Sequence, residues 1–128
     1  MVSSGAGDDC RPRLAAPTSR LTAIVAANDL LGLGCYRAVR SLGKVIGVDV
    51  SITGYNDMPL LDLMQPPMTA VRVPYRQMGA DAASMLLALM GGDIVSPGRV
   101  MLTPTLVVRG STAPPAVTAT PGVAQSEV

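Results

Sequence analysis

Two short polar clusters contain the residues that could bind a ligand. Asn28 and Asp29 follow the apolar run 23–27, and Tyr55-Asn56-Asp57 follows a second run, 50–54. An Asn amide both donates and accepts hydrogen bonds, and an Asp carboxylate accepts several, which suits a polyhydroxylated or heterocyclic ligand. The same residue types often cap helices and form turns, so capping and ligand binding remain two open interpretations of each cluster.

Catalytic and metal chemistry is not indicated by this sequence. The chain has no His, which excludes a Ser-His-Asp or Cys-His arrangement and a Cys/His zinc site. Gly32-Leu33-Gly34 lies inside a predicted helix rather than in the turn before one, so it does not match a dinucleotide-binding loop. We therefore expect a protein that is not an enzyme and that uses no cofactor or metal.

Charge and hydropathy narrow the range of partners. The formal net charge is +1 and Lys and Arg are not clustered, so we do not expect the chain to bind DNA by itself. No apolar run approaches the roughly 20 residues of a membrane span, and no basic segment followed by an apolar one begins the chain. The sequence predicts a cytoplasmic protein without membrane contact.

The elements that must position the polar clusters alternate between strands and helices. Continuous apolar runs predict strands over 23–27, 50–54 and 69–73, while helical spacing predicts helices over 29–42 and 75–90 and a short helical piece over 58–64. The segment 100–109 contains Pro104, so it is either an edge strand or two pieces. This order predicts an α/β fold, an incomplete fragment of a doubly wound parallel sheet, with both polar clusters at the carboxyl edge where ligands bind.

The two ends differ in composition from the middle of the chain. Residues 1–20 mix Ser, Gly, Pro and Asp without a period, and residues 113–128 mix Pro, Ala and Thr. We expect both ends to be disordered. Residues 21–112 then form one partial domain.

Four sequence blocks resemble a known family. AIVAANDLLGLG (23–34), DVSITGYNDMPL (49–60), PPMTAVRVPYRQMG (66–79) and LVVRGST (106–112) occur in the order found in the C-terminal part of the sensor domain of LacI-type transcriptional regulators. The resemblance covers about residues 21–115. It implies a periplasmic-binding-protein-like fold of type I, in which a small effector, commonly a sugar or a purine, binds between two subdomains.

The resemblance also implies roles for particular residues. The implied effector-binding residues are Asn28, Asn56, Asp57, Val73 and Tyr75, and the implied dimer interface surrounds Leu33, Tyr36 and Met64. Asn56 departs from the family pattern, which usually has Asp there. Because a neutral amide replaces a charged acceptor, the effector of this chain is expected to differ from the usual ones.

The sequence-based interpretation is a truncated effector-binding and dimerisation portion of a LacI-type regulator, without its own DNA-binding headpiece. DNA binding then belongs only to the full-length family context. Two alternatives remain open: a stand-alone small-molecule or solute-binding module, and a non-functional gene fragment. In the family, the helix 75–90 belongs to a subdomain whose strands have no counterpart here, so we expect its apolar stripe to be exposed, folded back or covered by a second chain.

Overall fold

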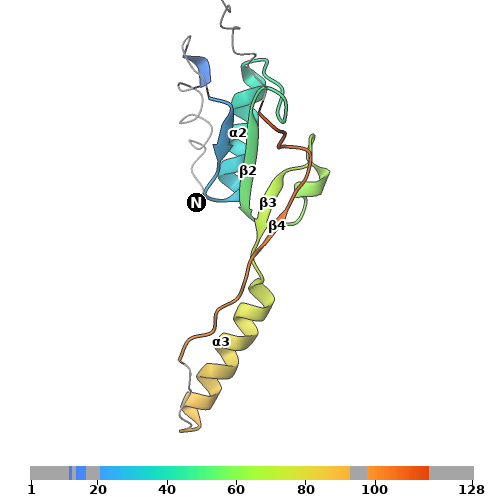
Figure 1. Ribbon diagram of the computed structural model, residues 1–128. Helices are drawn as coiled ribbons and strands as arrows, with labels where there is room; N and C mark the ends of the chain where they lie inside the picture. Colours follow the sequence, from blue (N-terminus) through green and yellow to red (C-terminus); the bar gives the residue numbers. More distant parts are fainter. Residues whose placement is uncertain (1–11, 13, 17–20, 93–97, 116–128) are drawn as a thin grey trace, which may run out of the picture.

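The computed structural model describes residues 12, 14–16, 21–92 and 98–115. They form a four-stranded sheet, a helix packed against it and a second long helix that extends away from it (Figure 1). The strands are β1 (Ala23–Val25), β2 (Ser51–Asn56), β3 (Thr69–Arg72) and β4 (Thr105–Val107). The helices are α2 (Asp29–Ser41), the 3-10 helix η1 (Leu61–Leu63) and α3 (Tyr75–Met90).

The sheet confirms the predicted α/β fold and corrects its last strand. The strand order is β1-β2-β3-β4, and β1, β2 and β3 are mutually parallel. β4 runs antiparallel to β3, with Val107 opposite Ala70 and Thr105 opposite Arg72. The sheet is therefore mixed, and of the two interpretations of 100–109 the edge strand is the one observed, beginning directly after Pro104.

β2 is longer than the sequence predicts. Tyr55 and Asn56, expected in a turn, belong to the strand because they pair with Val71 and Arg72 of β3. Asn56 has a φ of 115° and Asp57 a φ of 58°, so the chain turns away from the sheet within these two residues. Asn and Asp tolerate this left-handed conformation better than most residues, which explains their presence at this end of the strand.

α2 begins and ends where the sequence indicates. The Asn28 side chain caps it by accepting a hydrogen bond from the Leu31 N–H at 2.9 Å, and Gly43, with a φ of 69°, follows its last turn. Its buried face packs on the sheet. The core cluster consists of Leu14, Cys35, Tyr36, Ala38, Val39, Ile46, Val50, Ile52, Leu61, Met68 and Ala70.

Leu14 differs from the expected disorder of residues 1–20, since it is buried in this core. Apart from 12 and 14–16, that segment lies outside the described residues, as do residues 116–128 of the predicted tail. The described residues 113–115 form neither helix nor strand.

Two local predictions are wrong in detail. The uniformly apolar run 23–27 is typical of a strand covered on both faces, but β1 is an edge strand and Val25 is 85% exposed. The short helical piece expected over 58–64 is reduced to η1, because Leu60 takes a left-handed conformation with a φ of 83°, which a right-handed helix cannot include.

α3 extends beyond the sheet, with the segment 98–104 running beside it (Figure 1). None of its 16 residues is buried. The predicted apolar stripe is therefore exposed rather than folded back onto the sheet, and Leu86 and Leu89 are 57% and 58% exposed. Within the described part of the chain, no helix is long and apolar enough to span a bilayer.

Candidate functional site

A pocket of about 640 Å³ lies at the carboxyl ends of the parallel strands β2 and β3. Its lining residues come from the end of β2, the end of β3, the first turn of α3 and the segment before β4: Asn56, Asp57, Pro59, Arg72, Val73, Pro74, Tyr75, Arg76, Gln77, Thr103 and Thr105. Four of the five residues that the sequence predicts for effector binding, Asn56, Asp57, Val73 and Tyr75, are thus neighbours around one cavity. Asn28 is not among them.

Asp57 is held by two arginines. Its side chain is 4% exposed, Oδ2 accepts from Arg72 Nε and Oδ1 accepts from Arg109 Nη1, each at 2.7 Å. Burial by itself would raise the pKa of the Asp57 carboxyl, but the hydrogen bonds and positive charges of Arg109 and Arg72 outweigh it and lower that pKa. Both carboxylate oxygens are consequently occupied by the protein itself.

This pairing predicts how stability depends on pH. Because the folded state lowers the pKa of Asp57, the unfolded state takes up the proton first as the pH falls. The stabilisation is therefore complete above the unfolded value near 3.8 and is lost as the pH falls through the lower, folded value. We expect Asp57→Asn to lower the free energy of unfolding at pH 7 by about 2 kcal/mol, with the deficit shrinking towards pH 2.

Urea unfolding of both proteins at pH 7, 4 and 2 measures this effect. Asp62→Asn is the control. Asp62 is an exposed residue of η1, and its replacement by Asn removes the same charge. An equal deficit for Asp57→Asn at all three pH values would contradict the assignment.

Asn56 and Tyr75 connect the sheet to α3. The Tyr75 hydroxyl donates a hydrogen bond to Asn56 Oδ1. The acceptor oxygen of Asn56 is thereby used, whereas its NH₂ group remains a potential donor to a ligand. Since Tyr75 is the first residue of α3, this bond joins the last residue of β2 to the start of the helix.

Asn28 and Asp29 face a different set of partners. Asn28 is the N-cap residue of α2, and its Oδ1 accepts the capping hydrogen bond from the Leu31 N–H, so the capping interpretation is correct for that atom. Asp29 is fully buried; its Oδ2 accepts from the Met58 N–H at 2.7 Å, and among the described residues its Oδ1 has no hydrogen-bond partner. Asp29 thus ties the start of α2 to the turn that carries Asp57.

Sequence reasoning placed Asp29 in a candidate polar cluster, but it identified neither Arg72 nor Arg109 as part of the site. Gly54 is a signal that could have indicated the close contact with Asp29, because a glycine inside a strand often marks a close approach of another group. A Cβ at Gly54 would overlap Asp29 Oδ1 and lie 2.9 Å from Met68 Sδ. No local pattern marks the arginines, since Arg109 is 52 residues from Asp57.

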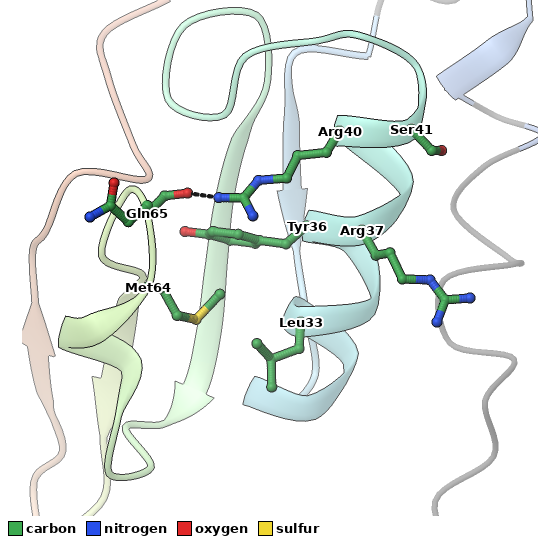
Figure 2. A pocket seen from close by; sticks show the side chains of 7 residues that line it. All are labelled: Leu33, Tyr36, Arg37, Arg40, Ser41, Met64 and Gln65. Atoms are coloured by element: carbon green, nitrogen blue, oxygen red, sulfur yellow. Dashed lines mark hydrogen bonds between the residues drawn. The ribbon is translucent and has the colours of Figure 1, made fainter.

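The three residues predicted for the dimer interface line a second pocket, of about 620 Å³, between α2 and the segment after η1 (Figure 2). Leu33 is partly exposed, whereas Tyr36 is buried and its hydroxyl donates to the Pro66 carbonyl at 3.1 Å. Burial raises the pKa of the Tyr36 hydroxyl, although Ser111 and Arg40 act in the opposite direction. Arg40 packs over the Tyr36 ring at 5.9 Å and donates to the Gln65 carbonyl.

Metal binding finds no support in the described part of the chain. No group of three or more His, Cys, Asp or Glu residues there is arranged to hold a metal ion. The lining of the pocket at the ends of β2 and β3 combines arginines, one aspartate, amides and hydroxyls.

Comparison with known proteins matches residues 3–112 to the periplasmic binding protein-like domain family. The chain is 45% identical over 92 residues to the HTH-type transcriptional regulator MalR of Streptomyces coelicolor, which is 72% of this chain and 27% of MalR. The chain thus spans about a quarter of the length of MalR and of the next relatives, among them CelR of Thermobifida fusca and the lactose operon repressor of Escherichia coli.

Two solved structures have the same fold. A lac repressor dimer bound to operator and the anti-inducer ONPF superposes with a TM-score of 0.77 at 32% identity, covering 86% of this chain and 38% of that one. A LacI family transcriptional regulator from Enterococcus faecium with bound ribose superposes with a TM-score of 0.71 at 29% identity, covering 89% and 42%.

Proposed function

Because this chain belongs to the periplasmic binding protein-like domain family, as part of the sensor domain of a LacI-type transcriptional regulator, we propose that its pocket at the ends of β2 and β3 binds a small effector. The effector is of the sugar or purine class. Since the relatives are transcriptional regulators, the chain is not an enzyme and the pocket serves recognition rather than catalysis.

The observation that carries this proposal is the convergence of Asn56, Asp57, Val73 and Tyr75 around one pocket. These residues lie at the end of β2 and directly after it, after β3 and at the start of α3, and the sequence resemblance assigned all of them to the effector. A bound ribose in the Enterococcus faecium regulator agrees with a sugar as one member of the effector class.

The position of the pocket suggests how binding is transmitted. The chain passes between the sheet and α3 twice, through 73–75 and through 103–104, and the pocket contacts both passages (Figure 1). An effector that touches the sheet side through Asn56 and the helix side through Tyr75 favours one relative orientation of the two. Asn28 would act from the neighbouring strand end, through the NH₂ group that its capping role leaves available.

The proposal includes a homodimer and a place in a larger regulator. The surface around Leu33, Tyr36 and Met64 is proposed as the dimer contact, with Leu33 supplying exposed apolar area, Met64 half-buried beside it and Tyr36 supporting both from the core. DNA is a partner only in the context of a full-length regulator, as in the lac repressor dimer bound to operator, and we place that regulator in the cytoplasm.

A ligand panel with one site variant tests effector binding. We expect at least one sugar or purine derivative to raise the melting temperature of the chain and to give a measurable Kd by calorimetry. Asn56→Ala removes a hydrogen-bond donor from the pocket and is expected to weaken that Kd roughly tenfold.

Gln65→Ala is the matched control, because it removes an exposed amide from the other pocket. A Kd that is the same in Asn56→Ala as in the unchanged chain would show that the pocket is misassigned. A panel in which no compound binds would overturn the proposed function itself.

A further inference from the structure

The charged acceptor of the pocket at the ends of β2 and β3 is the Asp57 carboxylate, which is already paired with two arginines. Asp57 is its one lining carboxylate, and both oxygens accept hydrogen bonds from Arg72 and Arg109. Asn56 Oδ1 accepts from the Tyr75 hydroxyl. Because the Asp57 side chain is 4% exposed and each of its oxygens already accepts from an arginine, it offers a ligand hydroxyl little accessible acceptor surface.

Donors remain in the same pocket. Arg72 uses Nε for Asp57, and within the described residues no partner is found for its two terminal nitrogens; the side chain is 58% exposed. Arg76, in the first turn of α3, is a second exposed lining cation, and the Asn56 NH₂ group is a third donor. Two of these three donors carry positive charge.

The remaining acceptors are neutral and few. Gln77 donates its own NH₂ group to Asp81, which leaves its carbonyl oxygen, and Thr103 and Thr105 contribute hydroxyls. Among the lining residues, the charges are two arginines and one aspartate, and that aspartate is already matched by Arg109 as well as Arg72. The electrostatic surplus at the pocket is positive.

We propose that this pocket takes a sugar or purine derivative that carries an oxyanion, a carboxylate or a phosphate ester, and that the terminal nitrogens of Arg72 bind this group. The inference rests on the proposed effector-binding function and specifies its ligand class. A planar guanidinium presents two parallel donors to an oxyanion, and such charge-assisted hydrogen bonds are stronger than those to a neutral hydroxyl. Asp57 is then a positioning residue, because it fixes Arg72 through Nε and leaves the other donors for the ligand.

Calorimetric titration with matched compounds tests the proposal. The probes are glucose, glucuronate and glucose 6-phosphate, adenosine and its 5′-monophosphate, and inorganic phosphate alone. We expect one anionic compound to bind roughly tenfold more tightly than its neutral parent, and the advantage to shrink as NaCl is raised. Glucuronate and glucose 6-phosphate separate a carboxylate from a phosphate ester as the oxyanion.

Arg72→Gln is expected to abolish the preference for the anionic compound. Arg37→Gln is the control and is expected to preserve that preference, because it removes the same charge from an exposed position on α2. If Arg72→Gln does not fold, Arg76→Gln is expected to reduce the preference severalfold, and the salt dependence in the unchanged chain gives an independent readout.

The other outcomes are distinguishable. A neutral parent that binds as tightly as its anionic derivative overturns the oxyanion assignment and leaves effector binding intact. Inorganic phosphate that binds as tightly as the phosphate esters also overturns it, because the site then recognises an ion and no effector. If neither the anionic compounds nor their neutral parents bind, the proposed function fails together with this inference.

Discussion

Gly54→Ala is expected to lower the free energy of unfolding by about 3 kcal/mol, a large share of the roughly 5 to 15 kcal/mol that holds a domain together. An added Cβ would overlap Asp29 Oδ1 and press on Met68 Sδ at 2.9 Å. Asp29 and Met68 are both fully buried, so a shift of either side chain disturbs the packing around it. Displacing Asp29 also breaks its hydrogen bond to the Met58 N–H and leaves a buried side chain without that partner.

Gly79→Ala is the matched control. Gly79 lies in the exposed middle of α3, where an added Cβ meets nothing within 4 Å, so alanine is expected to leave stability unchanged or to raise it by up to about 1 kcal/mol. Urea unfolding monitored by circular dichroism measures both variants. A Gly54→Ala protein within about 0.5 kcal/mol of the unchanged chain would mean that the contact between β2 and Asp29 is not as close as described.

The 128-residue chain is expected to associate with itself and to bind a hydrophobic dye through α3. Leu86, Leu87, Leu89 and Met90 are all more than half exposed, and no residue of this helix is buried. Since full burial of one such side chain is worth roughly 1.5 to 3 kcal/mol, a second copy that covers this face gains burial free energy from several side chains at once. We expect the double variant Leu86→Glu, Leu89→Glu to remove the association that runs through α3 from the sedimentation profile, leaving the proposed dimer through α2, and to remove the dye signal.

Leu33→Asp separates this surface from the proposed dimer contact on α2. Leu33 is 40% exposed and lines the other pocket, so its replacement is expected to weaken dimer formation without affecting dye binding to α3. A chain that sediments as a monomer and binds no dye before any substitution would contradict the exposed α3 face.

The positions of the elements follow from the local sequence. The core face of α2 recurs at helical spacing in Cys35, Ala38 and Val39, and Asn28 and Gly43 mark its ends. The apolar runs before Asn28 and around Ile52 and Ala70 became neighbouring parallel strands. Such patterns are readable because hydrophobic period, capping and chain breaking act over a few residues.

The resemblance to LacI-type regulators added a prediction that local patterns do not contain, namely which residues of different elements share one site. It assigned Val73 and Tyr75 to the same site as Asn56 although they lie on other elements, and the structure brings these residues to one pocket. Whether they contact an effector stays a prediction.

Only the tertiary structure decided what the polar residues do. Asp57 accepts from Arg109, 52 residues away, and from Arg72 on the adjacent strand; Asp29 meets Met58, 29 residues away. Nothing in the local sequence distinguishes a carboxylate that faces a ligand from one already paired with arginines. That difference depends on the path of the chain between β2, β3 and β4, because a hydrogen bond requires an approach of about 3 Å and sequence spacing does not constrain contacts between distant segments that closely.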